Sequence, residues 1–226
     1  MNNKENGVKT MFQTVIFDLD GTILNTLEDL AAAGNWICRK HGWPEHTVEE
    51  YRQLVGTGMW NLLCLLSPMG EADPALEEAL ADYMEYYGQH CMEKTMPYPG
   101  IPQLLEELRS RGKKLAVYSN KGDRFCGELV EHYFPGVFHL IRGKVDGVPV
   151  KPDPIGLGLV MDALGAEQAT TLYVGDSNVD METARNGHLV SCGVTWGFRG
   201  QKELQEAGAV HLADTAEELL ALILAG

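Results

Sequence analysis

The stretch that decides the fold is Thr14-Val15-Ile16-Phe17-Asp18-Leu19-Asp20-Gly21-Thr22, in which four apolar or β-branched residues lead into two carboxylates and a glycine. Such a run is typical of a strand covered on both faces, as in a parallel sheet with helices above and below. Ligands bind beyond the carboxyl ends of the strands in such sheets. Asp18 and Asp20 are therefore predicted to lie in a metal and phosphate site. The simpler alternative is a polar strand end, where Thr22 only caps a following helix.

The composition favours a globular protein without nucleic-acid or membrane partners. The chain has 226 residues, of which 45% are hydrophobic, and this is enough for a full core. Residues 1–10 are polar and predict a flexible extension, and no apolar run is long enough for a membrane span. The five scattered cysteines argue against a disulfide framework or a zinc site. The net charge of −14 disfavours binding to nucleic acid or anionic membranes, so we expect a soluble cytoplasmic protein.

Strand-like and helix-like segments alternate in the second half of the chain. Short apolar runs predict further strands at residues 114–118, 137–141, 171–174, 189–194 and 210–212. Apolar residues at helical spacing predict helices between them, at 100–109, 154–164 and 180–186. This alternation predicts an α/β fold with a doubly wound, Rossmann-like parallel sheet.

Residues 24–92 interrupt that alternation. They carry helical patterns at 27–40, 48–54, 59–66 and 75–91 and no convincing strand. We therefore expect an all-helical domain inserted after the first strand, here called the helical insertion. The α/β core would then consist of residues 11–23 and 93–226.

Four polar elements fall at the ends of predicted strands, and three of them directly follow an apolar run and should converge at one edge of the sheet. Taken singly, each could be a helix cap or a solvated turn, but their joint order favours a common site. They are Asp18/Asp20, Ser119-Asn120-Lys121, Lys151-Pro152-Asp153-Pro154 and Gly175-Asp176-Ser177-Asn178-Val179-Asp180.

The chemistry of these residues suits Mg²⁺ and phosphate. Mg²⁺ takes a near-octahedral shell of oxygens, which three carboxylates and one backbone carbonyl could supply. A carboxylate about 4 Å from a phosphate charge is repelled by about 4 kcal/mol at an effective dielectric constant near 20, so nearby cations are needed. Lys151 and the Ser119 hydroxyl are candidates for holding phosphate oxygens. The expected metal ligands are Asp18, Asp176, Asp180 and the backbone carbonyl of Asp20.

These four elements resemble the motifs of the haloacid dehalogenase-like (HAD) superfamily of phosphotransferases. The resemblance implies that Asp18 is the nucleophile and Asp20 the general acid and base. It also implies that Ser119 and Lys151 stabilise the phosphoryl group, and that Asp176 binds Mg²⁺ with support from Asp180. Thr22 and Asn120 belong to the same motifs and are expected to contact substrate. The helical insertion resembles the cap that closes over the site in one branch of the superfamily and selects the substrate.

Within that branch the chain is most similar to phosphoglycolate phosphatases. The similarity lies in Val55-Gly56-Thr57-Gly58, Tyr98-Pro99-Gly100-Ile101 and Val194-Thr195-Trp196-Gly197-Phe198-Arg199. It implies a Mg²⁺-dependent phosphatase that hydrolyses a small phosphorylated metabolite through an aspartyl-phosphate intermediate, as a monomer or homodimer.

Two departures concern the helical insertion. Asn25 stands where many relatives have an acid. Residues 28–85 carry eleven acidic side chains against three basic ones. A carboxylated phosphate needs a cation or free amides, and the sequence offers Arg52 and the loop Gly56-Thr57-Gly58 for that role.

Three other functions are compatible with the same fold. A sugar phosphomutase similar to β-phosphoglucomutase would carry the same motifs and pass the phosphoryl group to a second hydroxyl. A phosphonate-cleaving enzyme would need a reactive lysine in the helical insertion, where Lys40 is the one lysine and has no activating neighbour. A non-catalytic relative would not require the full set of charged groups that this chain has.

Overall fold

The computed structural model describes residues 12–225, and the predicted extension at residues 1–10 lies outside them. A six-stranded, wholly parallel sheet has the order β5-β4-β1-β6-β7-β8. Its strands are β1 (Thr14–Phe17), β4 (Lys114–Gly122), β5 (Leu140–Lys144), β6 (Thr171–Gly175), β7 (Val190–Val194) and β8 (His211–Ala213). The predicted α/β fold is confirmed, and β1 lies inside the sheet between β4 and β6.

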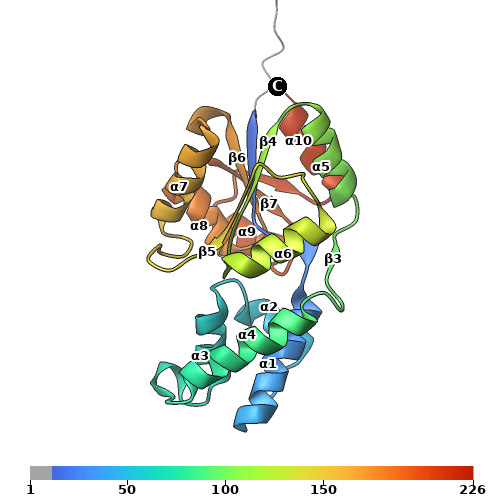
Figure 1. The fold of residues 1–226 in the computed structure, drawn as a ribbon. Helices are drawn as coiled ribbons and strands as arrows, with labels where there is room; N and C mark the ends of the chain where they lie inside the picture. Colours follow the sequence, from blue (N-terminus) through green and yellow to red (C-terminus); the bar gives the residue numbers. More distant parts are fainter. Residues whose placement is uncertain (1–11, 226) are drawn as a thin grey trace, which may run out of the picture.

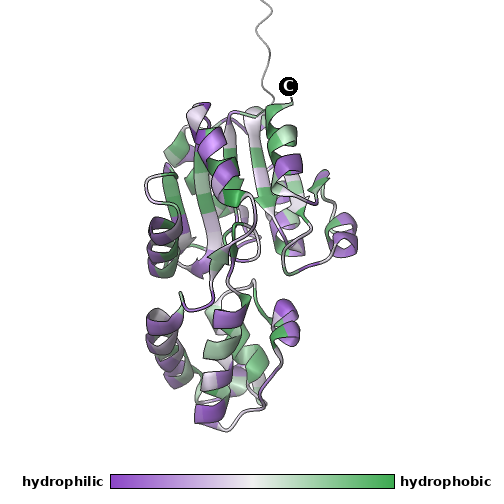
Figure 2. Ribbon diagram, turned by 90° about the vertical axis from the view of Figure 1, so that its right-hand side faces the viewer, coloured by the Kyte–Doolittle hydropathy of each residue, from purple (hydrophilic) through white to green (hydrophobic). Residues whose placement is uncertain are grey.

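Helices cover both faces of the sheet (Figure 1). Val15 and Phe17 of β1 belong to one apolar cluster, while Ile16 between them belongs to another. Side chains alternate between the faces of a strand, so β1 is buried on both sides. The helices of the core are α5 (Ile101–Ser110), α6 (Asp123–Tyr133), α7 (Pro154–Leu164), α8 (Asn178–Asn186), α9 (Gln201–Glu206) and α10 (Ala216–Leu224). Figure 2 shows strands with many hydrophobic residues between helices that carry both hydrophobic and hydrophilic residues.

Four helices lie beyond the carboxyl end of β1, where the helical insertion was expected (Figure 1). They are α1 (Leu27–His41), α2 (Val48–Leu54), α3 (Met59–Leu66) and α4 (Leu76–His90). Short 3₁₀ turns occur at Gly70–Ala72 and Gln168–Thr170. The division of the chain into domains at residues 24 and 92 stays a prediction.

The sequence patterns located most elements to within a few residues. The predicted bounds of α2, α3 and α7 agree with the structure. Two short strands, β2 (Leu24–Asn25) and β3 (Met96–Pro97), pair with each other at the two ends of the insertion. A strand of two residues is too short to show the alternation of apolar and polar side chains. The sequence therefore predicts an entirely helical segment at residues 24–92, although β2 lies within it. Among residues 12–225, no helix is both long enough and apolar enough to cross a membrane.

Asp29 joins the two chain segments that connect the insertion to the core. Its side chain lies in the first turn of α1 and is 3% exposed. One carboxylate oxygen accepts hydrogen bonds from the backbone N–H and the hydroxyl of Thr95, each at 2.8 Å, and the other accepts from Lys94 N at 3.0 Å. The entry to α1 and the return segment are therefore held together by one buried carboxylate.

We expect Asp29→Ala to lower the free energy of unfolding by about 3 kcal/mol, because three donors would lose a charged acceptor in a buried place. Thermal denaturation followed by circular dichroism measures this loss. Glu28→Ala, at the neighbouring exposed position, is the matched control and should stay within about 0.5 kcal/mol of the wild type. Equal stability of the two variants would contradict this role of Asp29.

Candidate active site

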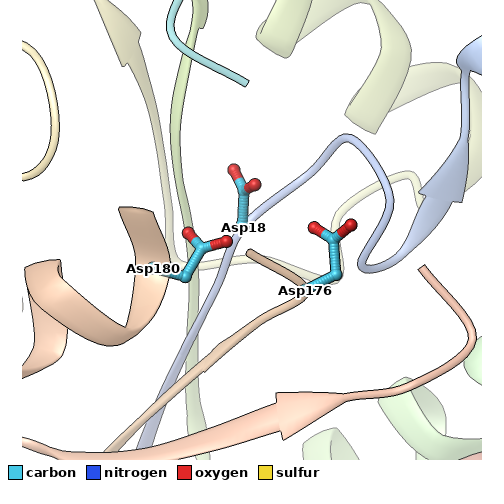
Figure 3. A group of neighbouring side chains, drawn as sticks. All are labelled: Asp18, Asp176 and Asp180. Carbon is cyan, nitrogen blue, oxygen red and sulfur yellow. The ribbon is translucent and has the colours of Figure 1, made fainter. Parts of the chain in front are cut away.

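Three carboxylates meet at the carboxyl edge of the sheet (Figure 3). Asp18 follows β1, Asp176 follows β6, and Asp180 lies in the first turn of α8. One oxygen of each lies within 4.8 Å of an oxygen of the other two. All three residues are buried. The sheet order explains this meeting, because β1 and β6 are neighbours and their parallel chains end at the same edge.

The turn after β1 is shaped around Asp176. Gly21 has a φ of 81°, and a Cβ at this position would collide with the Asp176 carboxylate, so the turn requires glycine on both counts. The Thr22 hydroxyl donates a hydrogen bond to Asp176 Oδ1 at 3.2 Å, and the backbone N–H of Phe198 donates to Oδ2 at 2.6 Å. Thr22 therefore orients the Asp176 carboxylate.

Asp180 is held by the helix that carries it. Ser177 and Asp180 form a capping box at the start of α8, in which Ser177 Oγ donates to Asp180 Oδ2 at 2.6 Å. The other oxygen accepts from Lys151 Nζ at 2.8 Å and from the Tyr173 hydroxyl at 3.3 Å. Both oxygens thus have hydrogen-bond partners, and one of these partners is the Lys151 ammonium.

Lys151 places a buried cation between two of the carboxylates. Its Nζ lies 2.9 Å from Asp18 Oδ1 and 2.8 Å from Asp180 Oδ1, and the residue is 3% exposed. Asn120 fixes the lysine backbone, since its side chain accepts from Lys151 N at 2.8 Å and donates to Lys151 O at 3.2 Å. Asn120 Nδ2 also donates to the Gly56 carbonyl in the helical insertion at 3.1 Å. Its contacts therefore join the core to the insertion.

Burial and mutual repulsion perturb these acids. Burial raises the pKa of Asp18 to about 6, although the Lys151 ammonium opposes the rise. Burial and the neighbouring carboxylates hold the pKa of Asp176 well above its ordinary value. Burial alone would lower the pKa of Lys151, but Asp18 and Asp180 outweigh it and raise that pKa. The cluster is therefore short of positive charge even with the lysine in place.

The donor set of this cluster fits a hard divalent cation. Asp18 Oδ1 is buried and has the Lys151 ammonium, at 2.9 Å, as its ion-pair partner among residues 12–225. Asp176 has no ion pair with a described lysine or arginine. A cation of the size and hardness of Mg²⁺ would take these carboxylate oxygens.

Asp20 has a different environment. Its two oxygens lie 2.9 and 3.0 Å from Lys121 Nζ, and the Thr26 hydroxyl donates to Oδ1 at 2.7 Å. The Asp20 carboxylate is thus paired with Lys121 and is not part of the cluster of Asp18, Asp176 and Asp180, and the place of its backbone carbonyl in a metal shell stays a prediction. The sequence places Lys121 in the second polar element, directly after Ser119 and Asn120, but assigns it no role at the site.

A small cavity of about 40 Å³ separates the strand ends from the helical insertion. A water molecule needs about 10–15 Å³ on this measure, so the cavity has room for a small organic group. The core side of its wall consists of Asp18, Asp20, Ser119, Asn120 and Lys121. The insertion contributes Leu30, Val55, Gly56, Gly58, Met59, Leu62 and Tyr83.

Two residues proposed from the sequence for substrate binding lie away from this cavity. Arg52 donates to the Gly197 carbonyl at 3.0 Å and pairs with Glu49 at 2.9 Å, so its guanidinium joins the insertion to the loop after β7. Thr57 is not among the described lining residues, whereas its neighbours Gly56 and Gly58 are. The direction of an arginine side chain depends on packing between distant segments, which residue spacing does not encode.

We expect Lys151→Met to lower the free energy of unfolding by about 3 kcal/mol at neutral pH without added metal, because two buried carboxylates would face each other without a cation. Denaturant unfolding measures this change. Lys144→Met, at an exposed position, is the control and should stay within about 0.5 kcal/mol of the wild type. A stable Lys151→Met protein would show that the lysine does not hold the cluster together.

Comparison with known proteins agrees with this geometry. Residues 15–194 match the family model described as haloacid dehalogenase-like hydrolase. The chain is 34% identical over 219 residues to a phosphoglycolate phosphatase of Pseudomonas putida, covering 93% of this chain and 79% of that protein. It is 36% identical over 208 residues to one of Neisseria meningitidis, covering 88% and 87%.

A solved structure extends the similarity to three dimensions. A protein from Lactobacillus delbrueckii subsp. bulgaricus, provisionally described as a phosphoglycolate phosphatase, has a TM-score of 0.86 and 34% identity, covering 96% of this chain and 100% of that one. The family model spans most of the chain and includes the carboxylate cluster. The chain belongs to the haloacid dehalogenase-like hydrolases.

Proposed function

We propose that this protein is a phosphatase that hydrolyses a small phosphomonoester, with phosphoglycolate as the leading substrate. The observation that carries the proposal is the Asp18 carboxylate, which is buried beside the Lys151 ammonium and lines the cavity under the helical insertion. A carboxylate in this position is suited to attack a phosphorus atom. The names of the relatives in Pseudomonas putida and Neisseria meningitidis support the choice of substrate.

We further propose that Asp18, Asp176 and the backbone carbonyl of Asp20 hold Mg²⁺, with Asp180 in support. The ion would offset the charge of the phosphate and of the attacking carboxylate. The high pKa of Asp176, caused by burial and by the neighbouring carboxylates, supports this assignment because a carboxylate in such a place calls for a cation.

In the proposed reaction an Asp18 oxygen attacks phosphorus and forms an aspartyl phosphate, while the bond from phosphorus to the leaving oxygen breaks. Asp20 gives its proton to the leaving alkoxide. It then takes a proton from a water molecule whose oxygen attacks phosphorus, so that the bond from phosphorus to the Asp18 oxygen breaks, inorganic phosphate leaves and the Asp18 carboxylate is restored. Lys151 and the Ser119 hydroxyl would hold the phosphoryl oxygens throughout.

The cavity fits the leaving group in this scheme. Asp18 and Asp20 both line it, so an alcohol bound there would lie next to the proposed acid. The helical insertion forms its opposite wall and would exclude bulk water from the aspartyl phosphate until the alcohol has left.

We propose a cytoplasmic location and a small phosphorylated metabolite as the partner, with the protein acting as a monomer or homodimer. The five cysteines are free, which is typical of a reducing compartment. The net charge of −14 opposes binding to nucleic acid.

We expect Asp18→Asn to lower phosphate release at least about a thousandfold while the protein stays folded, because an amide is a poor nucleophile. The assay is phosphate release from phosphoglycolate, sugar phosphates, nucleotides and an aryl phosphate with Mg²⁺, and a chelator should abolish it in the wild type. Near-normal activity of Asp18→Asn would rule out the aspartyl phosphate. Interconversion of sugar phosphates without net release would instead indicate a mutase.

The acid cluster also predicts how stability depends on pH. The pKa of Asp18 is raised from 3.8 to about 6 in the folded protein, and that of Asp176 is raised as well, so the folded state binds protons more tightly than the unfolded state. When a chelator removes metal ions, the stability gained from protonated Asp18 is complete below about pH 4. It is lost as the pH rises through about 6. Mg²⁺ should therefore raise the melting temperature at pH 7.5 by several degrees and have little effect at pH 5.

Asp176→Asn removes one of the repelling carboxylates. Without metal at pH 7.5 this variant should melt above the wild type, and Mg²⁺ should no longer raise its melting temperature. Asp162→Asn, at an exposed position on α7, is the control and should respond to Mg²⁺ as the wild type does. A full Mg²⁺ response in Asp176→Asn would contradict its role as a ligand. Thermal melts at the two pH values, with and without metal, measure all these effects.

A further inference from the structure

Tyr83 of α4 carries a polar group that the fold leaves unused. Its side chain is fully buried, it lines the cavity beside Asp18, and its hydroxyl has no hydrogen-bond partner among residues 12–225. Burial holds the pKa of Tyr83 well above its ordinary value, so the hydroxyl is a donor at neutral pH. A buried hydroxyl without a partner is costly, and a bound acceptor would remove that cost.

Lys121 provides a positive charge at the same cavity. Its side chain is 3% exposed, and its Nζ lies 2.9 and 3.0 Å from the two oxygens of Asp20. The ammonium also lies 4.7 Å from the centre of the Tyr87 ring. A lysine ammonium has three donors, so two hydrogen bonds to Asp20 leave one for a ligand. Of the described residues that line the cavity, Lys121 is the one with a positive charge.

The rest of the cavity wall limits what can bind. Leu30, Val55, Met59 and Leu62 present apolar side chains to a space of about 40 Å³. A sugar would bring several hydroxyl groups against these side chains and leave them without partners. A carboxylate on a short carbon chain needs a cation and one donor, which Lys121 and Tyr83 can provide.

A carboxylate bound in this cavity would need a nearby cation. It would lie beside Asp18 and Asp20, and both acids would repel it if ionised. Lys121 lies next to Asp20 at this wall and can offset the repulsion.

We propose that Lys121 and Tyr83 form the binding site for a carboxylate on the leaving alcohol, and so select phosphomonoesters of short hydroxy acids over neutral or sugar phosphates. The proposal rests on the phosphatase function proposed above. Lys121 would bind the carboxylate through its charge, and Tyr83 would donate a hydrogen bond to one of its oxygens. Tyr83 is a specificity residue in this scheme and takes no part in bond breaking.

The test compares phosphoglycolate with its neutral amide, phosphoglycolamide, which has nearly the same size and lacks the charge. The measured quantity is the ratio of kcat/KM for the two esters. General damage to the active site lowers both values and leaves their ratio unchanged, whereas loss of carboxylate recognition lowers the ratio.

Tyr83→Phe should lower this ratio about tenfold or more, as expected for a lost hydrogen bond to a charged group. Tyr87→Phe is the matched control. Tyr87 stacks on Tyr83 with ring centres 5.6 Å apart, and its hydroxyl also lacks a partner in the described part of the chain, but it is not among the residues that line the cavity. Its variant should keep the wild-type ratio. Lys121→Met should lower the ratio more than Tyr83→Phe, in addition to any loss through Asp20.

An unchanged ratio in Tyr83→Phe, or an equal fall in Tyr87→Phe, would overturn the proposal. The proposal would also be overturned if the protein released phosphate from other esters but not from phosphoglycolate or phosphoglycolamide. Its phosphatase activity would then still stand. No release from any ester would contradict the proposed function itself. In that case calorimetric binding of phosphoglycolate and phosphoglycolamide to Asp18→Asn, with and without Tyr83→Phe, decides the carboxylate site: selective binding of the acid that Tyr83→Phe weakens supports it, and equal binding overturns it.

Discussion

The active site depends on the buried ammonium of Lys151, which lies between Asp18 and Asp180. Three carboxylates gather at the edge of the sheet because parallel strands end there, and their mutual repulsion would be severe in a buried place. The lysine offsets part of it and leaves Asp176 without a cation of its own. One arrangement therefore provides the carboxylate, the cation and the further carboxylate to which the proposed mechanism assigns attack on phosphorus, phosphoryl binding and metal binding.

Contacts between the core and the helical insertion surround this site. The backbone N–H of Phe198 donates to Asp176, and the neighbouring Gly197 carbonyl accepts from Arg52 of the insertion. In the opposite direction, Arg199 reaches from the core and donates to the Val55 carbonyl at 3.1 Å. The loop after β7 thus contacts both the acid cluster and the insertion. A change in the position of the insertion would therefore move the loop that holds Asp176.

Much of this architecture could be read from local patterns, and the exceptions have physical reasons. Runs such as residues 14–17 and 171–174 are apolar because both of their faces are buried, so they identify the parallel sheet. The pair β2 and β3 has two residues in each strand and leaves no periodic signal. Helix α6 has apolar residues at helical spacing, Phe125, Cys126, Leu129 and Val130, so its sequence also carries a helical signal.

The sequence by itself determined the α/β fold and the order of the four motifs, because hydrophobic period and strand-end position are local properties. It also identified the acids and the lysine of the cluster, since parallel strands bring their ends to one edge. Only the tertiary structure decided that Lys121 pairs with Asp20, that Tyr83 lines the cavity and that Arg52 contacts Gly197. These contacts join segments far apart in the chain, so they depend on how the helical insertion packs over the sheet, and no local pattern of residues specifies that packing.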